Sequence, residues 1–272
     1  RVMSQIQISS VEGNIQKLDG GAMFGNAPRV VWEKWIKPDS LGRIPLACRS
    51  LLIEFEDRKI LCETGIGLFF EPKLRERFGV EGATHLLRDN LRAMGVREDE
   101  ITDVILSHLH FDHAGGMLTS FEEGTPQLIF KNARVFVGQE AWERAQAPHS
   151  RDRASFIPAL NELLAKSPHL RVIESDARTH RELPSFISFE VSHGHTPGQM
   201  HTVVQGKNAR TIFCGDMIPG RAWVHIPITM GYDRFPEKLI DEKSSILKSW
   251  ARPDSWLFFT HDFEVAAARV SF

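Results

Sequence analysis

Cysteine is scarce in this sequence, which holds only three among 272 residues: Cys48, Cys62 and Cys214. They lie far apart, and two of them lie inside apolar runs that are typical of strands. A disulfide framework needs more cysteines and an oxidising compartment. We therefore expect three buried thiols in a cytoplasmic protein.

Long apolar runs and blocks of one charge are also missing. A membrane-spanning helix needs about 18 apolar residues, and no stretch approaches that length. The N-terminus does not show the charged, apolar and small-residue regions of a signal peptide. The 33 basic and 35 acidic residues leave a net charge of -2 and form no long run of one sign. This composition predicts no surface for nucleic acid or membrane lipid. We expect a small or neutral partner.

Strand-like and helix-like segments alternate along the chain without a low-complexity linker or a repeat. Short apolar runs predict strands, and apolar residues at helical spacing predict helices. The expected strands lie at 49–55, 59–65, 101–108, 133–138, 186–192, 201–206, 210–216 and 255–262, and the expected helices near 81–96, 140–146, 155–166 and 236–250. Two groups of strands, each with helices, predict a single α/β domain over residues 1–272.

One stretch, "SHLHFDHAGG", concentrates imidazole groups directly after a strand-like run. Imidazole nitrogens and carboxylates are ligands that zinc, iron and manganese accept, so a bound cation explains this crowding best. A solvated polar loop, or one catalytic histidine with capping neighbours, is the alternative. The two glycines that follow allow a close approach of the backbone. The candidate ligands are His108, His110, Asp112 and His113.

Three later positions repeat the pattern of an apolar run followed by a metal-ligand residue. They are His195 in "FEVSHGHTPGQ", where His193 is also available, Asp216 in "TIFCGD" and His261 in "WLFFTHD". Each residue alone is more readily a surface or capping residue. Together with the histidine cluster, they predict one metal site at the edge of a sheet.

The ordered signature H-x-H-x-D-H, a later His, a later Asp and a final His resembles that of the metallo-β-lactamase superfamily. The resemblance extends from the hairpin near Arg49 to His261. It implies an αββα four-layer sandwich, with two mixed sheets flanked by helices and two divalent metal ions between the sheet edges. Zinc is expected, and iron, manganese or cobalt would fit the same ligands. The implied ligands are His108, His110 and His195 for one metal, Asp112, His113 and His261 for the other, and Asp216 as the bridge.

Two metals that share a water lower its pKa toward about 7 and supply hydroxide. Asp112 or Asp216 is then expected to carry the proton toward the leaving group. Glu63, in "CETGIG", stands where relatives usually have Asp. We expect it to support residues 107–113, which we call the histidine loop. The serine-nucleophile motif G-x-S-x-G does not occur.

The "GHTPG" turn and "GD" after a strand most resemble the lactonase and methyl-parathion-hydrolase-like branch. N-acyl-homoserine lactonases commonly place a tyrosine shortly after the bridging aspartate, whereas the only tyrosine here, Tyr232, lies further along the chain. Tyr232 or His225 is expected to assist at the substrate carbonyl, unless a metal alone does so or the substrate differs. The resemblance also makes a homodimer plausible.

Two apolar stretches that contain Gly and Pro, "DGGAMFGNAPRVVW" and the segment after Asp216, are expected to be loops. They would close an apolar pocket over the metals, with Phe24 and Trp223 in its wall, and such a pocket suits a small apolar or amphipathic substrate. The alternative is that they pack the sheets together. The predicted activity is metal-dependent hydrolysis of lactones or carboxylic esters. A phosphotriesterase or phosphodiesterase is the first alternative, followed by an iron-dependent redox enzyme and a zinc-binding module without catalysis.

Overall fold

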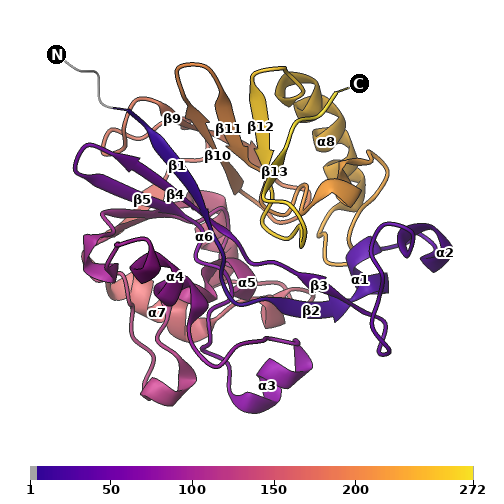
Figure 1. The fold of residues 1–272 in the computed structure, drawn as a ribbon, viewed down its shortest axis with the longest axis horizontal. Coiled ribbons are helices and arrows are strands. Elements are labelled where there is room, and N and C mark those ends of the chain that lie inside the picture. Colours follow the sequence, from indigo (N-terminus) through magenta and orange to yellow (C-terminus); the bar gives the residue numbers. More distant parts are fainter. Residues whose placement is uncertain (1–4, 272) are drawn as a thin grey trace. The chain divides into compact units, whose positions relative to one another are not determined.

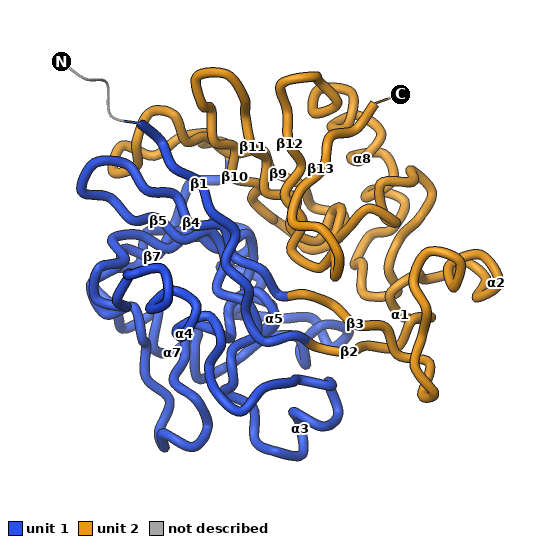
Figure 2. The backbone as a smooth tube through the Cα atoms, in the orientation of Figure 1, with its two compact units in different colours: residues 1–15, 48–175 blue, residues 16–47, 176–272 orange. Residues whose placement is uncertain are grey.

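The structure is a computed structural model that describes residues 5–271. Contacts between residues divide the chain into two compact units that are interleaved along the sequence, as Figure 2 shows in two colours. Unit 1 holds the residues up to 15 together with 48–175, and unit 2 holds 16–47 together with the residues from 176 onward. A single domain over residues 1–272 stays a prediction.

Unit 1 is built on a mixed sheet of six strands. Its strands, in spatial order, are β1 (Gln7–Val11), β4 (Ser50–Phe55), β5 (Arg58–Cys62), β6 (Asp103–Ile105), β7 (Arg134–Gly138) and β8 (Leu170–Ile173). The pairs β1–β4 and β4–β5 are antiparallel, and the following three pairs are parallel. The hairpin predicted between residues 49 and 65 is therefore confirmed, and its turn places Glu56 at a positive φ of 53°.

Unit 1 also contains α-helices. They are α3 (Pro72–Arg77), α4 (Leu86–Ala93), α5 (Phe111–Ala114), α6 (Gln139–Gln146) and α7 (Pro158–Lys166). Leu87 and Leu91, four residues apart on α4, are fully buried in the same cluster as Val104 and Val135 of the sheet. The helix predicted over 81–96 is shorter than expected, because Gly82 has a positive φ of 109° and the backbone at His85 is extended.

Unit 2 contains a second mixed sheet, of five strands. In spatial order they are β13 (Ala267–Ala268), β12 (Ser255–Phe258), β11 (Arg210–Phe213), β10 (Gln199–Gln205) and β9 (Ile187–Ser192). Only β11 and β12 pair in parallel. The helix α8 (Pro236–Trp250) lies beside this sheet (Figure 1) and buries Leu239, Leu247 and Trp250 in one cluster with Ile212 and Leu257.

The segment 16–47 of unit 2 folds into short elements that the sequence did not reveal. They are the antiparallel pair β2 (Gln16–Asp19) and β3 (Arg43–Leu46) and the helices α1 (Gly20–Phe24) and α2 (Arg29–Trp32). The expectation of a loop over "DGGAMFGNAPRVVW" is wrong, because Asp19 caps α1 by accepting a hydrogen bond from the Ala22 amide at 2.8 Å. Phe24 is fully buried between the rings of Trp32 and Trp223, at centroid distances of 5.4 and 4.6 Å. Phe24 therefore belongs to the core of unit 2.

All three cysteines are buried thiols, as the composition predicted. Burial raises the pKa of the Cys214 thiol far above its usual value, so this side chain stays protonated. Within residues 5–271, no helix combines the length and the apolar character that crossing a bilayer requires.

Candidate metal centre

Four predicted ligands follow four strands at the same distance along the chain. Each ligand is the third residue after its strand ends: His108 after β6, His195 after β9, Asp216 after β11 and His261 after β12. Within unit 2, β11 and β12 are parallel and their last residues, Phe213 and Phe258, are paired. Asp216 and His261 therefore follow the carboxyl ends of neighbouring parallel strands, which is where α/β folds place their binding sites.

In unit 1, the "HLHFDH" stretch brings three imidazole rings together. The ring of His108 lies 4.4 Å from that of His110 and 4.2 Å from that of His113, measured between centroids. Asp112 lies on the single turn of α5, with its Oδ1 3.7 Å from Nε2 of His113. All four side chains are buried, and Asp112 is the most exposed at 9%. Neutral imidazoles and a carboxylate packed this closely fit a cation.

Glu63 touches this loop at both of its ends, as expected of a supporting carboxylate. Its Oε1 accepts a hydrogen bond from the Ser107 amide at 2.9 Å, and its Oε2 lies 3.7 Å from Nδ1 of His113. The next residue, Thr64, donates from its amide and its hydroxyl to the carbonyl of His113, at 3.0 and 3.1 Å. Glu63 is fully buried and has a positive φ of 66°. The turn after β5 therefore braces the histidine loop.

The glycines after the histidine loop are required by close approach. A Cβ at Gly116 would overlap the carbonyl of Thr64, and one at Gly115 would overlap the carbonyl of Ile66. The Gly116 carbonyl accepts a hydrogen bond from Nε2 of His85 at 3.1 Å. Burial lowers the pKa of His85 to about 4, so this histidine is neutral at pH 7. His85 falls within the helix predicted over 81–96, and nothing in the sequence indicates this contact.

In unit 2, the carboxylate of Asp216 lies between two imidazoles. Its Oδ2 is 3.2 Å from Nε2 of His195, and its Oδ1 is 3.2 Å from Nε2 of His261. All three side chains are buried. The structure therefore brings together the three ligands that the sequence predicted in this half of the chain.

The other nitrogen of each of these histidines donates to an oxygen that can only accept. Nδ1 of His195 lies 2.8 Å from Oδ1 of Asp233, and Nδ1 of His261 lies 2.6 Å from the Ala47 carbonyl. Each neutral ring therefore carries its proton on Nδ1 and turns the lone pair of Nε2 toward Asp216. Lone pairs facing a carboxylate at 3.2 Å repel it unless a cation lies between them, so the donor set fits a divalent metal.

The electrostatics of His195 show the same demand for positive charge. Burial alone would lower its pKa, but the charges of Asp216 and Asp233 outweigh burial and raise it to about 10. Asp233 is itself held by the Met230 amide, which donates to its Oδ2 at 2.7 Å. Asp233 could not be identified from the sequence, because nothing in "GYDRF" indicates a contact with His195.

A buried chain of hydrogen bonds fixes the backbone of Asp216. Its amide donates to Oε1 of Gln199 at 2.7 Å, and Nε2 of Gln199 donates to the hydroxyl of Ser192 at 3.3 Å. That hydroxyl lies 2.7 Å from Nε2 of His201. Burial lowers the pKa of His201 to about 4. A neutral His201 can donate from Nδ1 to the Phe213 carbonyl, 3.2 Å away, and accept from Ser192. The chain runs in one direction, so every donor has an acceptor.

The turn "SHGHTPG" is held against the first part of α8. The amides of His193 and Gly194 donate to the carboxylate of Glu242, at 2.8 and 2.6 Å. Nδ1 of His193 accepts a hydrogen bond from the Gly198 amide at 3.0 Å, so this ring stabilises the turn. Of the two histidines in the motif, His195 is the one that faces Asp216.

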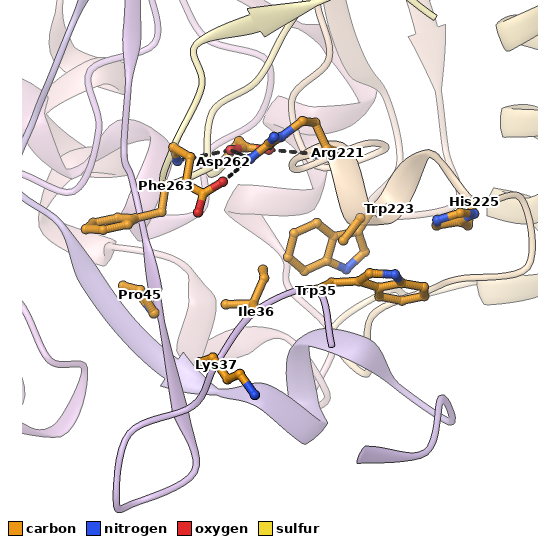
Figure 3. A pocket seen from close by; sticks show the side chains of 11 residues that line it. Trp35, Ile36, Lys37, Pro45, Arg221, Trp223, His225, Asp262 and Phe263 are labelled. Carbon is orange, nitrogen blue, oxygen red and sulfur yellow. Dashed lines mark hydrogen bonds and ion pairs between the residues drawn. The ribbon is translucent and has the colours of Figure 1, made fainter. Parts of the chain in front are cut away.

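Unit 2 also contains a cavity of about 480 Å³ beside the segments that follow Asp216 and His261. Figure 3 shows the rings of Trp35, Trp223 and Phe263 along it. Arg221 is neutralised there by Asp262, at 2.9 Å, and by Glu264, at 2.5 Å. The remaining lining residues are Ile36, Lys37, Pro45, Ala222 and His225.

The two candidates for the missing lactonase tyrosine lie in different surroundings. The ring of His225 stacks on that of Trp35 at a centroid distance of 4.9 Å and lines the cavity. Tyr232 lies further along the same loop, and its side chain is 43% exposed. Assistance by His225 or Tyr232 at a substrate carbonyl stays a prediction.

The family profile described as "Metallo-beta-lactamase superfamily" matches residues 43–261, which is most of the chain. The chain belongs to the metallo-β-lactamase superfamily. It is thus a metal-dependent hydrolase, and the predicted α/β fold with two mixed sheets and flanking helices is confirmed.

Two solved structures resemble the chain closely in fold, and they and a curated sequence resemble it modestly in sequence. A probable metal-dependent hydrolase from Staphylococcus aureus is 26% identical with a TM-score of 0.86, over 98% of this chain and 93% of that one. AidC, described as a dizinc quorum-quenching lactonase, is 22% identical with a TM-score of 0.79, over 100% and 93%. An N-acyl homoserine lactonase from Bacillus cereus is 25% identical over 182 residues, and the match spans 62% of either chain.

Proposed function

We propose that this superfamily member is a dinuclear hydrolase that opens lactones or cleaves carboxylic esters. The observation that carries the proposal is the carboxylate of Asp216, which offers one oxygen to the side of His195 and the other to the side of His261. One carboxylate shared in this way suits a bridge between two metals. In the proposal, His108 and His110 join His195 at one metal, and Asp112 and His113 join His261 at the other.

Zinc is the proposed metal at both positions. Imidazole and carboxylate ligands suit zinc and also accept iron, manganese or cobalt. The dizinc description of AidC, which shares the fold, supports zinc over the alternatives. The hydrogen bonds to Nδ1 of His195 and His261 orient the rings for a metal at Nε2.

Two divalent ions so placed would activate a shared water near neutral pH and polarise the carbonyl under attack. Asp112 is the most exposed of the predicted ligand side chains, so it is best placed to pass a proton to a leaving group. The backbone amide of Asp216 donates to Gln199, which holds the backbone from which the bridging carboxylate projects. Buried surroundings exclude water and strengthen these interactions.

The substrate class follows from the cavity in unit 2 and from the relatives. A cavity of about 480 Å³ lies within the size range of small-molecule sites, and three aromatic side chains line it. Its Arg221 is neutralised by Asp262 and Glu264, which disfavours a multiply charged phosphate. Neutral lactones and esters suit this lining. The lactonase names of the relatives support the same substrate class. A neutral aryl phosphotriester is the second candidate.

Hydrolysis of three substrates tests the proposal: an acyl lactone, an aryl ester and an aryl phosphotriester. We expect the lactone or the ester to be turned over fastest, and Asp112→Asn to reduce kcat by about 100-fold or more, because proton transfer contributes that much. Asp57→Asn, at an exposed turn residue, is the matched control and should leave kcat unchanged. A preference for the phosphotriester, or equal activity of the two variants, would overturn the proposal.

A further inference from the structure

Lys243 is a charged residue buried in the core of unit 2. It lies in the middle of α8, and its side chain is 0% exposed. Its Nζ donates to the carbonyls of Trp223 and His225, both at 2.9 Å, and to that of Ile228 at 2.6 Å. An ammonium group has three N–H donors. All three of them are therefore used within one short segment of the loop after Asp216.

A buried ammonium is costly unless hydrogen bonds replace its lost hydration. Burial lowers the pKa of Lys243 to about 8, and the charge of Asp233 acts against that shift. At neutral pH the group is therefore still mostly protonated and can serve all three carbonyls. A neutral amine has only two N–H groups and would leave one carbonyl without a donor. The protonated form of Lys243 thus supplies one N–H donor to each of three carbonyls in segment 223–228.

This segment carries side chains that line the cavity. Trp223 and His225 belong to its wall, and the His225 ring stacks on Trp35 (Figure 3). The loop is tied again at Met230, whose amide donates to Asp233, the residue that holds His195. Lys243 thus holds the loop where it lines the cavity, and Asp233 holds it near His195, a predicted metal ligand.

We propose that Lys243 is a positioning residue that sets substrate selection by holding segment 223–228 as one wall of a subsite for the apolar part of the substrate. The proposal rests on the hydrolase function proposed above. The Nζ of Lys243 donates to backbone carbonyls of that segment, so it acts on the substrate through the positions of Trp223 and His225. Substrates with a large apolar group should depend on it, and small substrates should not.

The test compares Lys243→Met with Lys248→Met, an exposed lysine on the same helix. Met keeps the apolar stem and removes the three donors. Two measurements are made on the metal-loaded protein: amide hydrogen exchange over 221–230, and kcat and KM for a long-chain and a short-chain acyl lactone. If Lys243→Met does not fold, Lys243→Gln, which keeps two N–H donors, takes its place.

We expect exchange over 221–230 to accelerate in Lys243→Met and not in Lys248→Met. We also expect KM for the long-chain lactone to rise about tenfold because the subsite is no longer preorganised, while KM for the short-chain lactone changes less than about twofold.

Unchanged exchange would overturn the proposal. So would an equal fall of kcat for both lactones with KM unaltered, because a purely structural role gives that result. If the wild type hydrolyses neither lactone, the hydrolase proposal fails, and the exchange measurement still decides whether Lys243 anchors the loop.

Discussion

Hydrogen bonds to Nδ1 orient the rings of three predicted ligand residues. Nδ1 of His195 is held by Asp233, Nδ1 of His261 by the Ala47 carbonyl, and Nδ1 of His108 lies 2.8 Å from the Ser107 hydroxyl. Such contacts fix the tautomer and the orientation of the ring, and a carboxylate partner also raises its basicity. His195 is the only one of these three whose described Nδ1 partner is charged, so it should respond most to a change of partner.

Asp233→Asn should weaken metal binding by about 10- to 100-fold, the usual effect of losing such a supporting contact. The neutral amide no longer strengthens His195, and its NH₂ group would face either the histidine Nδ1 or the Met230 amide. Competition with a chelator gives the affinity directly. Asp241→Asn, at an exposed position of α8, is the control. Equal affinities for the two variants would contradict the role given to Asp233.

His85 gives a pH dependence that can be measured separately. Its pKa is lowered from 6.5 to about 4 by burial, so between these values the unfolded chain binds more protons than the folded one. Stability is therefore complete above pH 6.5 and is lost as the pH falls toward 4, by about 3 kcal/mol in total.

His85→Gln keeps a donor for the Gly116 carbonyl and removes this titration. Urea unfolding at pH 7 and pH 5 should show a smaller loss for His85→Gln than for the wild type. His149→Gln, at an exposed loop histidine, should lose as much as the wild type. Parallel losses in all three proteins would refute the pKa assigned to His85.

At the scale of elements, the site depends on where strands end and on what crosses them. Four predicted ligands each lie three residues after the end of a strand, so the strand ends determine where these side chains begin. In unit 1, the turn after β5 passes directly against the loop after α5, and Gly115 and Gly116 make that crossing possible. The histidine loop and the β5 turn therefore form one packed element.

Gly116→Ala should destabilise the protein by about 3 kcal/mol, because its Cβ would overlap the Thr64 carbonyl. Gly116 does not have a positive φ, so the effect reports overlap alone. Gly95→Ala is the converse control, since Gly95 has a φ of 79° and no neighbouring atom within 4 Å. It should cost about 1–2 kcal/mol through backbone strain. Thermal unfolding distinguishes the two, and a milder effect at Gly116 would contradict the packing described.

The long helix α8 and the apolar strand runs were predictable from the sequence, whereas the short helices of segment 16–47 were not. The helix α8 and the strands before the ligands appear as apolar patterns, so their positions were predicted within a few residues. The helices α1 and α2 have five and four residues and cannot show a helical period. The sequence predicts Lys243 only as part of a helix, because its carbonyl partners lie 15 to 20 residues away in the chain.

At the scale of the whole molecule, the predicted ligands are divided between the two units. The residues of "HLHFDH" belong to unit 1, whereas His195, Asp216 and His261 belong to unit 2. The sequence could single out these seven positions as candidates, because each lies in a local motif after an apolar run and together they match the signature that the family resemblance implies. Support from Asp233, Gln199 and Glu242 could not be predicted, because it depends on folding within unit 2. In the proposed centre, neither unit alone supplies the ligands for two metals.

The central claim, a dinuclear centre built by both units, is tested most directly by anomalous X-ray diffraction from crystals of the metal-loaded protein. The account predicts two metal peaks per chain about 3.5–4 Å apart. One should be bound by His108, His110 and His195, the other by Asp112, His113 and His261, with Asp216 between them. A single peak, or metal bound away from these seven residues, would contradict the account.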